Sequence, residues 1–198
     1  MAKIDLTILK QLREETGVGM QDAQSALEET AGDIVKAKEI LRKKGAAKAD
    51  KKSTRTTSQG LIESYLHAGG KVGVLVEVNC ETDFVAKTED FKNFVHDLSL
   101  QVAAAAPQYV TREDVPAEVI AKEKEIAMEQ LKTQGKPEAI AEKIVTGKLE
   151  KFYEDNCLLE QVSIKDSKLK INQMLNDLVN KLGENIKIRR FVRYQLGE

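Results

Sequence analysis

Residues 72–87, VGVLVEVNCETDFVAK, decide the fold, because the hydrophobic pattern changes its period at their C-terminal end. Apolar residues first alternate with others, which is the period of a half-buried β-strand. They are Val72, Val74, Val76 and Val78. A stripe at helical spacing then predicts a helix over residues 88–105. Its members are Phe91, Phe94, Val95, Leu98 and Val102. A strand that leads into an amphipathic helix is typical of an α+β domain.

The flanking segments extend this strand into a small sheet. Leu61–Leu66 precedes the pair Gly69-Gly70, which predicts a β-hairpin with the valine strand. Residues 185–196 alternate again, and we expect them to return to the hairpin as a third antiparallel strand. Three more helices are expected in between, which start after Pro116, at Pro137 and near Ile171. The predicted core is therefore a small antiparallel sheet packed by helices.

Residues 4–44 predict three short helices that form a bundle of their own. The first ends at Thr16-Gly17, where glycine can adopt the left-handed conformation of a C-cap. Gly32-Asp33 offers a turn and an N-cap for the third. We therefore expect two domains: a three-helix domain with a basic linker over 1–54, and an α+β core over 55–198.

The stretch at residues 42–58 differs in character from both neighbours. Seven Lys or Arg residues oppose one Asp, and no large apolar residue is present. This composition predicts a solvated, flexible linker that is helical only at its start. Binding of RNA through the basic run is the alternative, but no aromatic residue is available there to stack on bases.

Composition excludes several classes of protein. The 198 residues are 41 % hydrophobic, and 31 basic residues nearly cancel 32 acidic ones, leaving a net charge of -1. This balance argues against direct binding to nucleic acid. No apolar run is long enough to cross a bilayer, and no signal peptide is recognised, so we expect a cytoplasmic protein without a membrane partner. Cys80 and Cys157 are expected to be buried thiols.

No motif for covalent chemistry or for a cofactor is present. The sequence contains no phosphate-binding loop, no GxGxxG, no GxSxG and no HExxH. Two histidines and two distant cysteines cannot form a zinc site. Cys80 with His67 or His96 would make a nucleophile–base pair by residue type alone, and both histidines are expected at the surface. We therefore expect that the protein uses no cofactor or metal and is not an enzyme. We expect it to bind another protein.

The segment between the valine strand and the following helix leaves two alternatives. Asp83 and Phe84 could form an exposed pair that brings apolar bulk and negative charge to a partner. Phe84 also lies seven residues before Phe91, so it could extend the buried helical stripe while Asp83 caps the helix. Spacing alone favours the buried alternative.

Several segments together resemble the elongation factor Ts family. They cover most of the chain in the order expected for the family: LREETGVGM at 12–20, DAQSAL at 22–27, VEVNCETDFVAK at 76–87, KPEAIAEKIVTGKLEKFYEDNCLLEQ at 136–161 and RRFVRYQLGE at 189–198. The resemblance implies a ubiquitin-associated-like three-helix domain followed by a sheet-and-helix core. It also implies a guanine nucleotide exchange factor for elongation factor Tu, without covalent catalysis.

The resemblance further implies two partner-binding segments. In the family a TDFV motif intrudes beside the Mg²⁺ site of elongation factor Tu and dislodges the ion. Here that motif is Thr82, Asp83, Phe84 and Val85. The N-terminal helices are expected to dock on the nucleotide-binding domain of the same partner. The residues that match this region are Leu12, Arg13, Thr16, Gly17, Val18, Gly19 and Met20.

The chain also departs from longer members of the family. It is short, and we expect it to lack their coiled-coil insertion and their second half-core. A homodimer that presents two halves, giving a two-to-two complex, is therefore a hypothesis. The predicted C-terminal strand contains no cysteine, which argues against a disulfide-linked form.

Overall fold

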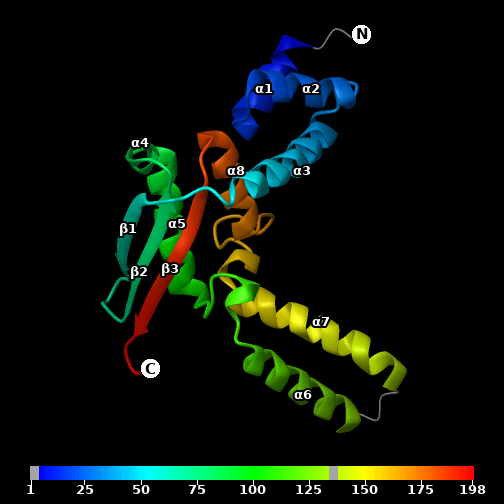
Figure 1. The fold of residues 1–198 in the computed structure, drawn as a ribbon, viewed down its shortest axis with the longest axis vertical. Coiled ribbons are helices and arrows are strands. Elements are labelled where there is room, and N and C mark those ends of the chain that lie inside the picture. The colour runs from blue at the N-terminus through cyan, green and yellow to red at the C-terminus, as the bar shows by residue number, and fades with distance from the viewer. Residues whose placement is uncertain (1–4, 134–137) are drawn as a thin grey trace. The chain divides into compact units, whose positions relative to one another are not determined.

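The computed structural model describes residues 5–133 and 138–198. These residues form helices and a three-stranded antiparallel sheet of order β1-β2-β3, which confirms the α+β class (Figure 1). The chain divides into two compact units, each built from three segments. The first comprises residues 1–62, 77–95 and 173–188, and the second comprises residues 63–76, 96–172 and 189–198. The predicted division at residue 54 stays a prediction.

The N-terminal helices form the expected three-helix arrangement. They are α1 (Leu6–Thr16), α2 (Met20–Glu29) and α3 (Ile34–Lys52). Gly17 ends α1 in the left-handed conformation with φ 67°. The Asp33 carboxylate caps α3 by accepting from the backbone N–H groups of Val35 and Lys36. Leucines and alanines close a separate core: Leu9, Leu12, Ala23, Ala26, Leu27, Ala37 and Leu41.

Helix α3 is longer than the sequence predicts. It continues to Lys52. The prediction of a flexible linker over 42–58 is therefore wrong for residues up to Lys52. Alanine and lysine are strong helix formers, and the small residues Gly45 and Ala49 are buried on one face of the added turns. Residues 54–58 connect the helix to the sheet without regular structure.

The predicted hairpin is present. Strands β1 (Gln59–Leu66) and β2 (Val72–Cys80) are joined by a tight turn in which Gly69 and Gly70 have φ of 89° and 68°. Strand β3 (Ile186–Gln195) pairs with β2, as expected for the C-terminal segment. At its end, the N–H of Leu196 donates to the carbonyl of Lys71 at 2.8 Å.

The alternation of burial in β3 shifts by one residue along the strand. Ile186 and Ile188 are buried, whereas Val192 and Tyr194 are exposed. Arg193 instead points toward the helix α5 (Glu89–Ala105), where its Nε donates to the carbonyl of Ala103 at 3.3 Å. The sequence pattern alone, which alternates from Ile186 to Leu196 without a break, did not indicate this shift.

The predicted stripe of α5 lies in the interior. All five of its apolar residues are buried, from Phe91 through Val102. Helix α8 (Ile171–Leu182) also follows the prediction, since Gly183 with φ 77° ends it. A four-residue helix, α4 (Asp83–Ala86), lies between β2 and α5.

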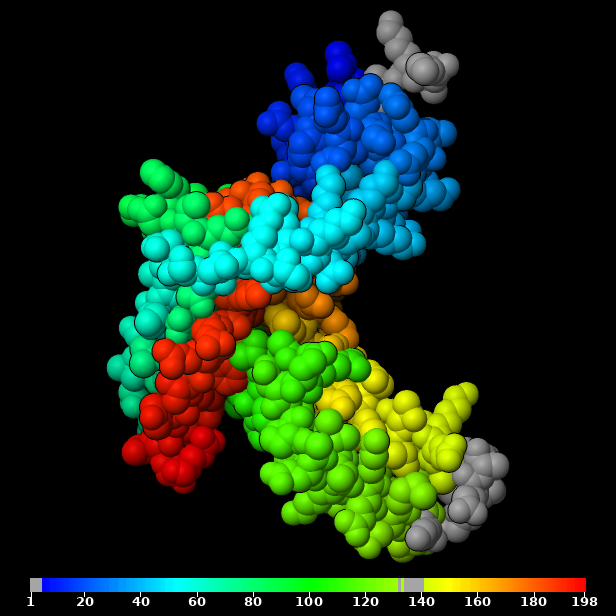
Figure 2. Space-filling model, in the orientation of Figure 1, coloured from blue at the N-terminus to red at the C-terminus, as the bar shows by residue number. Residues whose placement is uncertain are grey.

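Helices α6 (Ala117–Thr133) and α7 (Glu138–Asn156) pack side by side (Figures 1 and 2). They share a small core of Ala127, Leu131, Ala141 and Val145. The expected absence of the coiled-coil insertion of longer family members stays a prediction. The predicted helix start at Pro137 lies outside the described residues. Short 3₁₀ turns at Arg112–Asp114 and Leu158–Glu160 flank the pair.

Candidate functional site

Helix α4 carries the motif Thr82–Val85 on the surface. Thr82 is the N-cap residue, and its hydroxyl accepts a hydrogen bond from the backbone N–H of Val85 at 3.4 Å. Phe84 is 78 % exposed, more than any other large hydrophobic residue described. Figure 2 shows the α4 region on the molecular surface, with no other segment over it in that view. The alternative that places Phe84 in the core is therefore wrong.

The reason is a change of phase between α4 and α5. Helix α4 ends at Ala86, and α5 starts at Glu89. At the start of α5 the Thr88 hydroxyl accepts from the N–H of Phe91 at 3.3 Å, which is an N-terminal cap. Because two separate helices replace one continuous helix, a spacing of seven residues does not place Phe84 on the buried stripe with Phe91.

Asp83 lies beside Phe84 and is also exposed. Its carboxylate contacts the ammonium of Lys87, one turn later, at 2.6 Å. This hydrogen bond is the main cause that lowers the pKa of Asp83. The same ammonium lies 6.0 Å from the centroid of the Phe84 ring. The α4 surface thus combines an aromatic ring with an ionised carboxylate, as the exposed alternative required.

The strand end beneath α4 holds a buried thiol. Cys80 is fully buried, and its Sγ donates to the carbonyl of Thr82 at 3.1 Å. Burial raises the pKa of this thiol to about 11. A thiol that stays protonated is a poor nucleophile, so the pairing with His67 or His96 is not supported. His96 instead contacts Glu63 at 2.5 Å, and His67 contacts the hydroxyl of Tyr65 at 3.0 Å.

The N-terminal candidate residues divide into buried and exposed members. Leu12 is fully buried in the bundle core, and Val18 packs against that core. The hydroxyl of Thr16 donates to the carbonyl of Leu12 at 2.6 Å. The members left on the surface are Arg13, Gly17, Gly19 and Met20. Arg13 and Gly17 border a hollow whose wall includes Lys181 of α8.

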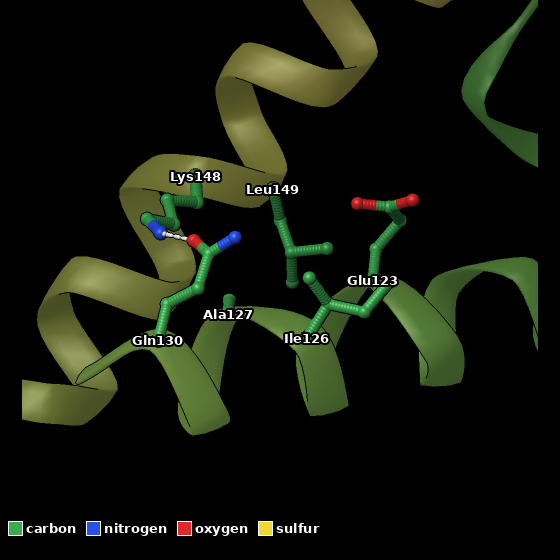
Figure 3. Close-up of a pocket in the computed structure, with 6 residues that line it drawn as sticks. All are labelled: Glu123, Ile126, Ala127, Gln130, Lys148 and Leu149. Carbon is green, nitrogen blue, oxygen red and sulfur yellow. Dashed lines mark hydrogen bonds between the residues drawn. The ribbon is translucent and has the colours of Figure 1, made fainter. Parts of the chain in front are cut away.

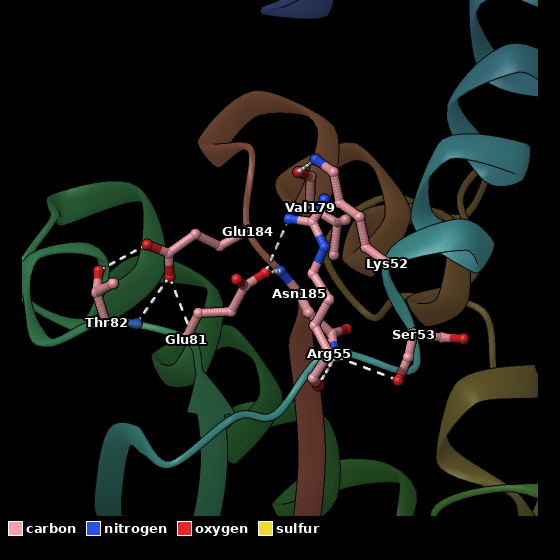
Figure 4. Close-up of polar contacts among 8 residues, drawn as sticks. All are labelled: Lys52, Ser53, Arg55, Glu81, Thr82, Val179, Glu184 and Asn185. Carbon is pink, nitrogen blue, oxygen red and sulfur yellow. Dashed lines mark hydrogen bonds and ion pairs between the residues drawn. The ribbon is translucent and has the colours of Figure 1, made fainter.

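No local sequence pattern indicates the carboxylate that contacts the motif from the far end of the chain. Glu184 accepts hydrogen bonds from Thr82, and it follows the glycine that ends α8. A single acidic residue after a helix has no local pattern that would assign it to a site. Only the fold brings it to the start of α4 (Figure 4).

A separate hollow lies between α6 and α7 and is lined by Glu123, Ile126, Ala127, Gln130, Lys148 and Leu149 (Figure 3). The ammonium of Lys148 donates to the side chain of Gln130 across it. Within residues 5–133 and 138–198, no group of three or more His, Cys, Asp or Glu side chains could hold a metal ion. In the same part of the chain, no helix is long and apolar enough to span a bilayer.

The described residues define an α+β protein that presents an aromatic side chain and a carboxylate on a short surface helix. A family model described as elongation factor TS matches residues 10–198. The elongation factor Ts of Anaeromyxobacter sp. (strain Fw109-5) is 58 % identical over 198 residues, which is 100 % of this chain and 90 % of that protein. The elongation factor Ts of Moorella thermoacetica is 58 % identical over 190 residues, covering 96 % and 94 %. The elongation factor Ts of Caldanaerobacter subterraneus is 55 % identical over 195 residues, which cover 98 % of each chain. The chain belongs to the elongation factor Ts family.

Proposed function

We propose that this chain is the guanine nucleotide exchange factor of elongation factor Tu in translation elongation, and that it acts in the cytoplasm. It speeds the release of GDP by disturbing the Mg²⁺ site of its partner. The observation that carries the proposal is the 78 % exposure of Phe84 on α4, in a chain of this family. The protein binds and reshapes its partner, and makes or breaks no covalent bond.

An exposed phenylalanine has a physical reason when a partner covers it. A large aromatic ring left in water loses the free energy that its burial would supply. Rigid aromatic side chains that enter a partner's pocket often dominate binding energy. Phe84 stands on a short helix whose four residues include no buried one, so the ring is free to enter such a pocket.

A Mg²⁺ site is easily disturbed by an inserted side chain, and the inserted Phe84 ring is called the wedge below. The ion requires near-octahedral coordination and bridges nucleotide phosphates to the protein that binds them. A small displacement of its surroundings therefore weakens the binding of GDP. Phe84 supplies the displacing bulk, and Asp83 places a negative charge beside it. Thr82 caps the helix that carries both residues, and the N–H of Val85 donates to its hydroxyl.

The second contact with the partner is proposed for the N-terminal bundle. Its exposed members Arg13, Gly17, Gly19 and Met20 would touch the nucleotide-binding domain, while Leu12, Thr16 and Val18 hold their backbone in place. If the factor weakens the binding of GDP to elongation factor Tu, GDP must weaken the binding of the factor by the same ratio. Two contacts let the factor stay bound while the wedge acts.

Binding of RNA through the basic run is the less favoured function. Residues 42–52 of the run are helical, and acidic side chains of α2 already contact two of its lysines. Lys48 contacts Asp22 at 2.8 Å, and Lys44 contacts Glu29. Ammonium groups that are paired in this way attract phosphates less strongly. We therefore propose no direct contact with nucleic acid.

We also propose a homodimer, formed through the side of the sheet that faces away from α5. Tyr65 faces His96 of α5 with ring centroids 6.4 Å apart, so the next residue, Leu66, points to the opposite side. On that side the exposed fractions are 70 % for Leu66 and 72 % for Tyr194. A second copy would cover these side chains and give a two-to-two complex with elongation factor Tu.

The release of a fluorescent GDP from elongation factor Tu tests the exchange activity. The intact chain should speed release strongly, and Phe84→Ala should slow it by about tenfold or more because the wedge is lost. The deficit should shrink when Mg²⁺ is lowered, since the ion is what the wedge displaces. No acceleration by the intact chain would refute the proposed function.

Light scattering at micromolar concentration tests the dimer. The expected mass is twice the 22.0 kDa of the chain. Tyr194→Lys would place a charge in the proposed interface and should shift the mass toward that of the monomer. A monomer that forms a fully active one-to-one complex would contradict the dimer but not the exchange activity.

A further inference from the structure

Helix α4 gains little stability from its own packing. It has four residues, and none of them is buried. An isolated turn of helix is unfavourable, because several backbone dihedrals must be fixed for very few hydrogen bonds. Contacts from outside the helix therefore help to fix the direction in which Phe84 points, and at its C-terminal end the Thr88 hydroxyl donates to the carbonyl of Val85 at 2.8 Å.

Glu184 makes that contact with three hydrogen bonds (Figure 4). Its Oε2 accepts from the backbone N–H of Glu81 at 3.1 Å and from that of Thr82 at 3.0 Å. Its Oε1 accepts from the hydroxyl of Thr82 at 2.6 Å. A carboxylate that accepts several hydrogen bonds is a strong anchor. Glu184 therefore fixes both the backbone that enters α4 and the side chain that caps it.

Asn185 extends the same anchor to a neighbouring segment. Its backbone N–H donates to the carboxylate of Glu81 at 2.6 Å. Its buried side chain donates to the carbonyls of Ser53 at 3.3 Å and Arg55 at 2.8 Å. Arg55 in turn contacts the Glu81 carboxylate at 3.4 Å. Two consecutive residues after α8 thus hold the entry to α4 and the segment that leaves α3.

We propose that Glu184, supported by Asn185, is a positioning residue for nucleotide exchange. It holds α4 in one orientation in the free protein, so that the Phe84 ring needs no ordering when it enters the partner. A side chain ordered before binding avoids an entropic cost that would otherwise weaken the complex. This inference rests on the proposed function, because it assumes that Phe84 is the group to be positioned.

A positioning role makes a different prediction from a general loss of stability. If Glu184 acts through Phe84, removing its carboxylate should lower the limiting rate of GDP release by about tenfold. The concentration of factor that gives half of the limiting rate should change by less than about twofold, since the N-terminal contact is intact. Unfolding of part of the sample would instead lower the active concentration.

The experiment measures release of fluorescent GDP from elongation factor Tu over a range of factor concentrations. The variants are Glu184→Ala, Phe84→Ala and the double variant. Removal of Glu184 should have no further effect once Phe84 is absent, because the two changes remove one interaction with the partner. Equal effects of Glu184→Ala with and without Phe84, or no effect at all, would overturn the proposal.

Two controls sharpen this result. In Glu184→Gln the amide oxygen can accept from both N–H groups and the amide nitrogen can donate to the Thr82 hydroxyl, so exchange should be largely restored. Glu89→Ala removes a carboxylate near the same loop whose contact is with the side chain of Lys92, at 3.0 Å, and it should leave exchange unchanged. Loss of exchange in Glu89→Ala equal to that in Glu184→Ala would make the effect one of charge and overturn the positioning role.

Amide hydrogen exchange tests the anchor without the partner. In Glu184→Ala the backbone amides of Glu81 and Thr82 lose their acceptor, and they should exchange with solvent at least about tenfold faster. Amides of the N-terminal bundle should keep their protection. Unchanged protection at Thr82 would overturn the proposal even if GDP release slowed. If Glu184→Ala shows the faster amides but the unaltered chain does not speed the release of GDP, the proposed function is refuted instead.

Discussion

Helices α4 and α5 follow one another in the chain but are stabilised in opposite ways. Phe91 of α5 is fully buried, whereas Phe84 of α4 is 78 % exposed. Helix α5 is anchored by apolar packing along its length, as expected for an amphipathic helix on a sheet. Helix α4 is anchored at one end by hydrogen bonds to Glu184, and its outer surface is left to other molecules.

The comparison separates what folding needs from what binding needs. Burial of an aromatic ring stabilises the fold but removes the ring from the surface. A polar anchor fixes the backbone of α4 and leaves its ring exposed. The same residue type therefore has a structural role at position 91 and, under the proposed function, a binding role at position 84.

The largest expected effect is on stability and comes from truncation of the buried ring. Phe91→Ala should lower the free energy of unfolding by about 3–5 kcal/mol, because it leaves a cavity in the core. Phe84→Ala should leave the free energy of unfolding nearly unchanged, because water already surrounds the ring. Denaturant unfolding of both variants measures the difference. Equal losses at the two positions would remove the contrast between the helices.

An intermediate effect is expected at alkaline pH from the buried thiols. Burial raises the pKa of Cys80 and of Cys157 from 9.0 to about 11. Between these values the unfolded chain loses the thiol proton and the folded chain keeps it. The free energy of unfolding therefore keeps its full value below pH 9 and falls as the pH rises through about 11. The fall is at most about 1.4 kcal/mol per pH unit for each cysteine.

Denaturant unfolding between pH 8 and 11 measures this slope, and Cys80→Ala should reduce it. The thiol lies beneath the entry to α4, so iodoacetamide should react with Cys80 only after unfolding. Rapid alkylation of the folded protein would show that the strand end opens and that α4 is less firmly anchored than proposed.

A smaller effect is expected from the cap that separates the two helices. Thr88→Ala removes the hydroxyl that accepts from the N–H of Phe91, and should cost about 1 kcal/mol. Thr146→Ala is the matched control: this hydroxyl lies within α7 and donates to the carbonyl of Glu142 at 2.9 Å. Since alanine is the better helix former, the control should cost nothing in thermal or denaturant unfolding.

Hydrophobic spacing was enough to predict most of the elements. Local patterns, each spanning a few residues, predict the valine strand, the buried stripe of α5 and the glycine that ends α8. The same approach failed where no large apolar residue marks the helix, as in the last turns of α3. Ala49 is buried there, but alanine and lysine in a basic run are equally typical of a linker.

Two residues of the site show where local sequence patterns are insufficient. The distance from Phe91 predicts a core position for Phe84, although the cap at Thr88, followed by Glu89 and Asp90, is a helix-start signal that argues for two helices. The resemblance to the family favoured the exposed position, which the structure bears out. Glu184 could not be found in this way, since its contact with Thr82 joins residues 102 apart in the chain.

The smallest expected effect on stability is at Asp83, where the exposed pair with Lys87 is screened by water. Asp83→Asn should shift the melting temperature by less than about 1 °C. The same change should slow GDP release if the carboxylate acts on the Mg²⁺ site, and the deficit should depend on the Mg²⁺ concentration. Lys87→Gln is the control, because it breaks the same pair and keeps the carboxylate, so it should not slow release. Slowing by both variants to the same extent would mean that the pair orders α4, and the role of Asp83 would then be the same as that proposed for Glu184.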